Sequence, residues 1–321
     1  MTTALGAIDL LTGYQAAAAL TAASRLGIFD LTAGVPATAG QIATALGTDP
    51  GGTLSLLDSL VGLGLLERMD SRYAATALSA RLGSAGDLRP VAEKEAFFAR
   101  AWLDLADTVR TGRPRIAAWE ERLVTDPDQC RDFLRALVVL ATETGPDLAA
   151  LVEPGARVVD LGGGLGSYAV PLARAGAEVR LIDLPAVAEW AGEELAAAPG
   201  ITVEAVDLTG PGALAALGPG SADVALVSHL LHDYDDIALR LLRLAREVVR
   251  EGGTVIVFEL PGDPGEGDLE AFGPMFDLMM RVETPGRARR VEELIDLLLA
   301  AGFSSVERTG HPLPHAVLLA R

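Results

Sequence analysis

The stretch RVVDLGGGLGS, residues 157–167, joins a short apolar run to a glycine-rich turn, and the sequence predicts a helix from about Tyr168 to Ala175 after it. Glycines let the backbone pass close to a ligand, so a strand that enters a helix through such a turn is typical of nucleotide-binding sheets. The turn by itself fits dinucleotides as well as other nucleosides. The residues around it must therefore decide which ligand the protein binds.

Short apolar runs that end in Asp or Gly alternate with helical segments in the second half of the chain. This pattern is typical of an α/β fold with a doubly wound sheet. Seven strands are expected, five of them parallel, in the runs RVVDLG (157–162), VRLIDL (179–184), ITVEAVDL (201–208), ADVALVSHLL (222–231), GTVIVFEL (253–260), FSSVERT (303–309) and AVLLAR (316–321). Ligands of such sheets bind at the carboxyl ends of the strands. We therefore expect the polar residues that end these runs to line one crevice.

Residues 1–87 predict a winged helix. Short helices that are each closed by a glycine precede a hairpin formed by residues 65–68 and 72–74. The helix that would enter DNA, residues 51–63, carries Asp58 and no Arg or Lys, so a dimerising role is favoured over DNA binding. Residues 88–150 are helical in pattern and are expected to contribute to a substrate pocket. Residues 151–321 are expected to form the sheet domain.

Composition narrows the partners of the protein. The formal net charge is -18 over 321 residues, which disfavours nucleic acid because phosphate binding depends on clustered Lys and Arg. No basic residue precedes Arg25, and no apolar stretch approaches the roughly 18 residues that a membrane span needs. A single cysteine, Cys130, excludes an internal disulfide and fits a reducing compartment. We expect a cytoplasmic protein with no membrane and no nucleic acid as partner.

Aspartates end three successive predicted strands. Asp160 lies two residues before Gly162, where its charge would repel a pyrophosphate but suits a ligand that carries an ammonium and a sulfonium. Asp183 lies where a carboxylate can accept hydrogen bonds from both ribose hydroxyls. Asp207 and Leu208 lie where they can bind the adenine amino group and cover the ring. The set favours S-adenosylmethionine over NAD as the cofactor.

The chain carries four recognisable motifs: VVDLGGGLG (158–166), DLPAV (183–187), LLHDYDD (230–236) and VIVFELP (255–261). Together they resemble the small-molecule O-methyltransferase family, which includes the plant caffeic acid and isoflavone enzymes and many bacterial relatives. The resemblance implies a class I methyltransferase with a Rossmann-like seven-stranded sheet and an N-terminal winged-helix dimerisation domain, and therefore a homodimer. It also implies a small-molecule acceptor and S-adenosylhomocysteine as product. The cofactor contacts that it implies are Gly162, Gly164, Asp183, Leu184, Asp207, Leu208 and Ser228.

The resemblance also implies the catalytic residues. In the family a histidine takes the proton of the acceptor, and the matching residue is His232, with Glu259 as the glutamate that orients it. A histidine suits this task because its ordinary pKa is about 6.5. The family adds a second glutamate in a Gly-Gly-x-Glu-Arg-Thr motif, which falls on residues 286–291 when counted without gaps from Asp277 and puts Arg289 in its place. An arginine there is expected to lower the pKa of His232 and to bind a carboxylate of the substrate.

The acceptor pocket is expected to be lined by Arg289 and by an apolar set at near-helical spacing: Phe272, Phe276, Met279 and Met280. Three functions remain open. They are O-methylation of an aromatic or enolic hydroxyl, C-methylation of an enolisable acid such as an α-keto acid held by an arginine, and cofactor binding without methyl transfer. No metal is expected, because His229 is interpreted as structural; Glu283 or His229 would be the residues to join His232 as ligands.

Overall fold

The computed structural model describes residues 3–321, which divide into two compact units, residues 3–100 and 101–321. Helix α7 (Arg89–Trp102) carries the chain from the first unit into the second. The three-part division predicted at residues 87 and 150 stays a prediction. Within the described residues no helix is both long enough and apolar enough to cross a membrane.

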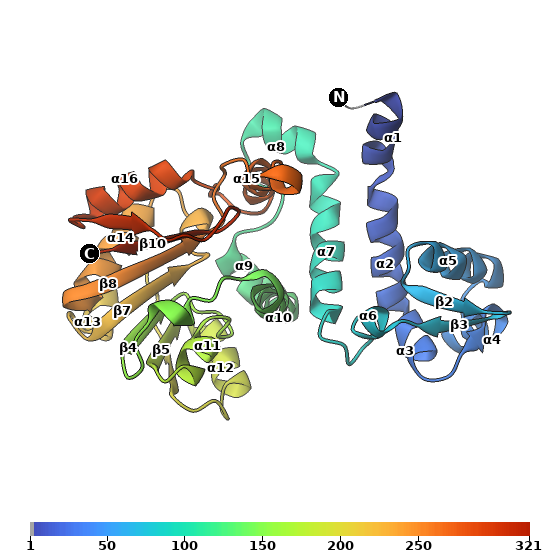
Figure 1. The fold of residues 1–321 in the computed structure, drawn as a ribbon, viewed down its shortest axis with the longest axis horizontal. Coiled ribbons are helices and arrows are strands. Elements are labelled where there is room, and N and C mark those ends of the chain that lie inside the picture. Colours follow the sequence, from blue (N-terminus) through green and yellow to red (C-terminus); the bar gives the residue numbers. More distant parts are fainter. Residues whose placement is uncertain (1–2) are drawn as a thin grey trace. The chain divides into compact units, whose positions relative to one another are not determined.

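The N-terminal unit contains the predicted winged helix (Figure 1). Its hairpin consists of β2 (Leu66–Met69) and β3 (Arg72–Ala75), and β3 also pairs with the short β1 (Ala37–Thr38). The helices of this unit are α1 (Ala4–Thr12), α2 (Tyr14–Leu26), α3 (Ile28–Ala33), α4 (Ala39–Leu46), α5 (Pro50–Gly62) and α6 (Ala77–Ala80). The hydroxyl of Tyr73 donates to Asp58 at 2.6 Å, so the acid of α5 anchors the hairpin.

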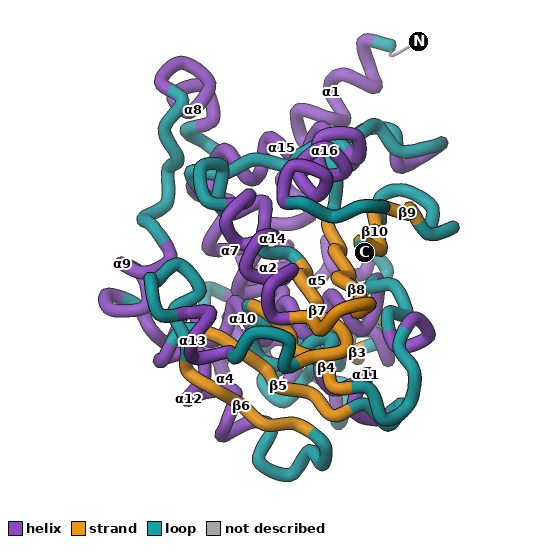
Figure 2. Tube along the Cα trace, turned by 90° about the vertical axis from the view of Figure 1, so that its left-hand side faces the viewer, coloured by secondary structure: helices purple, strands orange, loops and turns teal. Residues whose placement is uncertain are grey.

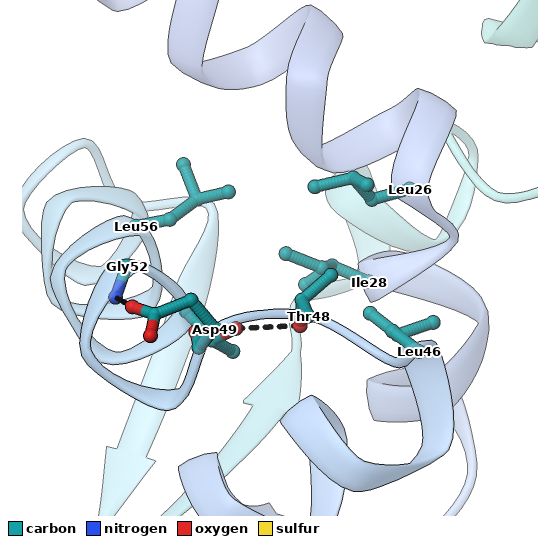
Figure 3. A pocket seen from close by; sticks show the side chains of 8 residues that line it. Leu26, Ile28, Leu46, Thr48, Asp49, Gly52 and Leu56 are labelled. Atoms are coloured by element: carbon teal, nitrogen blue, oxygen red, sulfur yellow. Dashed lines mark hydrogen bonds between the residues drawn. The ribbon is translucent and has the colours of Figure 1, made fainter.

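A small cavity of about 150 Å³ lies in this unit near α2, α4 and α5 (Figure 3). Aliphatic side chains such as Leu26 and Leu56 form much of its wall. Its polar groups already stabilise the fold, because Asp49 caps α5 by accepting the N–H of Gly52 at 2.6 Å. The lining therefore has no feature of an active site.

The C-terminal unit is built on a seven-stranded sheet of order β6-β5-β4-β7-β8-β10-β9, whose strands are orange in Figure 2. The strands are β4 (Arg157–Leu161), β5 (Glu178–Asp183), β6 (Ile201–Ala205), β7 (Ala222–Ser228), β8 (Val249–Glu259), β9 (Val306–Arg308) and β10 (Ala316–Ala320). Strands β4 to β8 are parallel, and β10 runs antiparallel to β8 and β9. The prediction of seven strands, five of them parallel, is confirmed.

Helices cover both faces of this sheet. The helical elements are α8 (Leu105–Thr111), α9 (Trp119–Thr125), α10 (Pro127–Thr144), η1 (Ala149–Leu151), α11 (Ala169–Arg174), α12 (Pro185–Glu194), α13 (Ala213–Leu217), η2 (Leu231–Asp233), α14 (Ala238–Val248), η3 (Gly267–Leu269), α15 (Phe272–Glu283) and α16 (Val291–Ala301). On α14 the buried residues Leu241, Leu242 and Ala245 recur at helical spacing, which places one apolar face against the sheet. Helices α14 and α16 share one core with the strands, and α10, α11 and α12 share another.

The strand order reverses between β4 and β7, because β5 and β6 extend the sheet on one side and β8 extends it on the other. Open α/β sheets bind ligands beyond the carboxyl ends of the strands at such a point. The glycine-rich turn follows β4 here, Ser228 ends β7, and Glu259 ends β8. The topology thus brings three segments that are far apart in sequence to one edge.

Candidate active site

The glycine-rich turn after β4 is held by a carboxylate from the neighbouring strand. Gly162 and Gly164 adopt φ angles of 75° and 56°, a region that favours glycine. Asp183 accepts the N–H of Gly164 at 2.8 Å with one oxygen and the N–H of Leu184 at 2.7 Å with the other. Burial raises the pKa of Asp183 to about 6, although these two backbone hydrogen bonds oppose the rise. Asp183 thereby ties the turn to the end of β5.

Asp160 is a buried acid whose charge the surrounding chain does not neutralise. It is 1% exposed, and within residues 3–321 neither carboxylate oxygen has a hydrogen-bond partner. Burial, together with the charge of Asp183, raises the pKa of Asp160 to about 7. A Cβ at Gly163 would come within 2.8 Å of Asp160 Oδ2, so the turn lies directly against this carboxylate. An ammonium would stabilise such a group, and these residues therefore fit a cofactor that carries one.

The remaining predicted cofactor residues lie at or beyond the same edge. Strand β6 ends at Ala205, and Asp207 lies in the turn beyond it, where its Oδ1 accepts the N–H of Thr209 at 2.8 Å. Hydrogen bonds from Thr209 lower the pKa of Asp207, which is exposed. Leu208 packs against the sheet core, and Ser228 is buried at the end of β7. Their contacts with the cofactor stay predictions.

His232 and Glu259 form a buried pair. Glu259 Oε2 lies 2.6 Å from His232 Nδ1, and Glu259 Oε1 accepts the N–H groups of Leu230 and Leu231 at 3.1 and 2.7 Å. An ionised carboxylate has no proton to give, so Nδ1 donates and Nε2 is left as the basic nitrogen of the neutral ring. Both residues lie where β7 and β8 end, as the sequence predicts for a base and its orienting glutamate. Their catalytic roles stay predictions.

The charges around His232 make it a strong base. Burial opposes the imidazolium, but the carboxylates of Glu259, Asp233 and Glu283 outweigh it and raise the pKa of His232 to about 9. Burial likewise opposes ionisation of Glu259, yet His232 and the backbone donors hold the pKa of that carboxyl below its usual value. The expectation that an arginine lowers the pKa of His232 is therefore wrong.

Arg289 is buried beside the loop that carries His232. Its Nη1 donates to the carbonyl of Leu231 at 2.6 Å, and its Nη2 donates to the carbonyls of Tyr234 and Asp235 at 2.9 and 3.2 Å and to the Asp235 carboxylate. These contacts hold the 231–235 loop. They do not support the expectation that Arg289 binds a carboxylate of the substrate. Moving the Gly-Gly-x-Glu-Arg-Thr motif back by one residue places its arginine on Arg289 and its glutamate on Ala288.

Helix α15 brings the predicted acceptor residues together around Phe276, with unequal exposure. The ring of Phe276 lies edge-on to the ring of His232, with centroids 5.3 Å apart. Phe276 forms a buried cluster with Met280 and Ala288, against which Met279 packs. Phe272 stacks on Phe276 at 6.4 Å and is 36% exposed. Phe276 is thus the member that contacts the base, and contacts of all four with an acceptor stay predictions.

His229 lies beside the pair with a positive φ of 51°. Its ring packs edge-on against Phe258 at 4.5 Å, and burial lowers the pKa of His229 to about 4, so it is neutral at pH 7. One ligand atom each of His229, His232 and Glu259 lies within 4.8 Å of the others. Oε1 of Glu259 already accepts two backbone N–H groups, and Oε2 contacts His232 Nδ1, so an ion at Oε2 would compete with that contact.

Two charged residues near the site were not assigned to catalysis or acceptor binding from the sequence. Glu283 is 7% exposed at the end of α15, and its charge acts on both His232 and Arg122. Arg122 is buried on α9, over the rings of Trp119 and Phe133, at 5.2 and 5.8 Å from their centroids. For Glu283 the sequence does hold a signal, because an acid seven residues after Phe276 shares its helix face.

Two family models match the chain: an O-methyltransferase domain over residues 102–304 and an O-methyltransferase dimerisation domain over residues 8–84. Among curated relatives, a 3-hydroxy-5-methyl-1-naphthoate 3-O-methyltransferase of Streptomyces sahachiroi is 32% identical over 96% of this chain and 92% of its own length. A mitomycin biosynthesis 6-O-methyltransferase of Streptomyces lavendulae is 33% identical over 94% of this chain and 89% of its own.

Solved structures agree with these matches. PigF with SAH superposes with a TM-score of 0.88 at 25% identity and covers 99% of both chains. Human N-acetylserotonin methyltransferase in complex with SAM gives a TM-score of 0.83 at 25% identity, over 98% of this chain and 95% of that one. The chain therefore belongs to the family of small-molecule O-methyltransferases that use S-adenosylmethionine.

Proposed function

We propose that the protein transfers a methyl group to the hydroxyl of a phenolic or enolic natural-product intermediate, with His232 as the general base and Glu259 as its orienting partner. The observation that carries this proposal is the 2.6 Å contact between Glu259 Oε2 and His232 Nδ1, which directs the basic Nε2 away from the glutamate. The name of the Streptomyces sahachiroi relative, which places the methyl group on the 3-hydroxyl of a naphthoate, supports an aromatic acceptor.

When bound, S-adenosylmethionine supplies an electrophilic methyl group. Asp160 is the residue that fits its ammonium, because this carboxylate is buried and its neighbours leave it without hydrogen bonds. Asp183 retains lone pairs for the ribose beside its two backbone hydrogen bonds. Leu208, Ser228 and the backbone of the glycine-rich turn complete the proposed cofactor surface.

The pKa of His232 selects the class of hydroxyl. A phenol has a pKa of about 10, so proton transfer to a base of pKa about 9 costs about 1.4 kcal/mol. The same transfer to a base with the ordinary histidine pKa would cost about 5 kcal/mol. An aliphatic hydroxyl with a pKa near that of water, about 15.7, would still cost roughly 9 kcal/mol. The site therefore favours acidic hydroxyls.

In the proposed reaction His232 Nε2 accepts the hydroxyl proton of the acceptor. Glu259 and Asp233 stabilise the imidazolium that results, and Glu259 keeps the ring oriented. Phe276 shields one edge of the imidazole ring from water. The acceptor oxygen is then an anion, the form in which it is the stronger nucleophile.

The C-methylation hypothesis needs an arginine, Arg289 or a neighbour, to hold the substrate carboxylate, and the guanidinium of Arg289 is engaged by the 231–235 loop. Cofactor binding without transfer does not account for the buried His232–Glu259 pair. Neither alternative has an observation of its own in the structure.

The test is an assay of the full-length enzyme with S-adenosylmethionine labelled in the methyl group, against panels of phenols, enols and α-keto acids. We expect methylated phenols whose label is on oxygen by carbon NMR, and a loss of about a hundredfold or more in kcat for His232→Gln. Label on carbon, or full activity of the variant, would contradict the proposal.

We further propose a cytoplasmic homodimer that binds no nucleic acid and no membrane. The dimerisation-domain match and the exposed apolar side chains of α1, such as Leu10 at 78% and Leu11 at 75%, support self-association. The net charge of -18 disfavours anionic polymers and anionic lipid surfaces. Light scattering of the purified protein tests the dimer, and a monomeric mass at micromolar concentration would contradict it.

A further inference from the structure

Glu283 ends α15 on the helix face that contacts the catalytic histidine. Phe276, Met280 and Glu283 follow one another at intervals of four and three residues, so they share one face. The first of them contacts the ring of His232 at 5.3 Å, and all three are buried. The helix therefore delivers a buried carboxylate to the wall of the site that Phe276 and Met280 form.

The chain after Glu283 also lies against the histidine. A side chain at Gly286 would collide with the carbonyl oxygen of His232, so the backbone at Gly286 lies against the backbone of His232. Segments on both sides of Glu283 thus touch His232. The loop itself, residues 284–290, reads TPGRARR and contains no acid.

A buried carboxylate in such a position needs a positive charge. Glu283 interacts electrostatically with Arg122, a buried arginine that donates to Gln129 at 2.7 Å, and its charge also favours the protonated form of His232. Among the described residues, Glu259, Asp233 and Glu283 are the charged groups that act most on the pKa of His232, and the ring of His229 lies beside it. Glu120 and Arg122 act on this group through Asp233.

We propose that Glu283 is a positioning residue for His232: its carboxylate, placed by the last turn of α15, stabilises the imidazolium that forms when the acceptor gives up its proton. This inference rests on the proposed role of His232 as the base. The family motif places a second glutamate in the loop after α15, and this chain has no acid there. The inference gives that role to Glu283, at the end of α15.

The variant Glu283→Gln tests the assignment, because it keeps the shape of the side chain and removes the charge. In the full-length protein without substrate, NMR titration of the histidine rings is expected to show the pKa of His232 lower by about one pH unit. The midpoint of the kcat against pH profile should fall by the same amount, with KM for the acceptor changed less than kcat.

Asp277→Asn is the matched control, since Asp277 is the other acid of α15 and pairs with Arg281 at 3.0 Å. It should leave the pKa of His232 unchanged. Glu283→Asp retains the charge and should restore most of the shift. If Glu283→Gln does not fold, the double variant Glu283→Gln, Arg122→Gln removes both buried charges and is titrated instead.

A folded Glu283→Gln protein in which His232 keeps its pKa would overturn the inference, whatever its melting temperature. The titration needs no acceptor, so it separates the two proposals. A lowered pKa together with a fully active His232→Gln enzyme would support the effect of Glu283 on His232 and contradict the base.

Discussion

Two buried acids lie near the carboxyl ends of strands of the same sheet and have opposite surroundings. Glu259, at the end of β8, accepts two backbone N–H groups and contacts His232, and its pKa lies below the usual value. Asp160, in β4, has no hydrogen-bond partner within the described residues, and burial raises its pKa to about 7. One acid has its partners in the chain, whereas the other has no hydrogen-bond partner among the described residues.

The difference separates catalysis from binding in this sheet. A hydrogen-bonded acid is fixed in place and can orient a base, which is the role proposed for Glu259 beside His232. An acid without partners costs folding free energy and gains it back when a cation binds, which suits Asp160 as a ligand contact. Substitution should therefore harm the rate at one acid and affinity at the other.

The largest effect is expected for Glu259→Gln. The amide can present an N–H to His232 Nδ1, which would move the ring proton to Nε2 and remove the base. We expect kcat to fall by about 10³-fold or more, as for other oriented catalytic histidines. The measurement is steady-state kinetics, with Glu251→Gln at the exposed start of the same strand as control. A loss confined to KM would show that Glu259 does not orient the base.

The pH dependence of the rate follows from the pKa of His232, about 9. The neutral ring is the active form, so kcat should rise about tenfold per pH unit from pH 7 and level off near 9. Stability should change in the opposite direction: the folded pKa exceeds the ordinary value, so protonation stabilises the fold at neutral pH and this contribution is lost as pH rises through about 9. A rate that is flat from pH 7 to 9 would contradict the assignment.

Asp160→Asn should separate affinity from stability. We expect S-adenosylhomocysteine to bind roughly tenfold more weakly by calorimetry, because the ammonium loses a buried charge. The folded pKa of Asp160, about 7, lies above its ordinary value. The folded protein therefore becomes less stable as pH rises from about 4 to about 7, because the unfolded chain ionises this acid first. The variant without ligand should therefore melt about 3 °C higher at pH 8.

The control for this experiment is Glu178→Gln, an exposed acid at the start of β5. It should change neither the affinity nor the melting temperature. If Asp160→Asn binds the ligand as tightly as the unchanged protein does, Asp160 is not the ammonium contact.

The strand ends could be predicted from the sequence, because each buried strand is a short apolar run that ends in a polar residue or glycine and alternates with a helical segment. Asp160, Asp183 and Glu259 all lie at the expected edge, since parallel strands share their carboxyl ends. The loop after α15 has no such pattern. A shift of one residue in the alignment with the family motif moves the position of its glutamate from Arg289 to Ala288. Asp207 shows the same limit, because β6 ends at Ala205 and leaves this acid in a turn.

Substitution of Arg289 is expected to change kcat least. It resembles Glu259 in having its partners within the chain, because its guanidinium donates to the carbonyls of Leu231, Tyr234 and Asp235. Arg289→Met leaves buried acceptors without donors, so we expect about 3 kcal/mol of destabilisation and a melting temperature lower by roughly 8 °C.

Arg287→Met is the matched control for Arg289, since Arg287 forms partly exposed ion pairs with Glu293 and Asp235 that are worth about 1 kcal/mol or less. Below its melting temperature, Arg289→Met should retain kcat within a few-fold and should bind acidic and neutral acceptors in the unchanged ratio. A variant that melts normally and selectively loses acceptors with a carboxylate would return Arg289 to the substrate pocket. The contacts of its guanidinium favour the structural outcome, because both Nη atoms donate to the loop that carries His232.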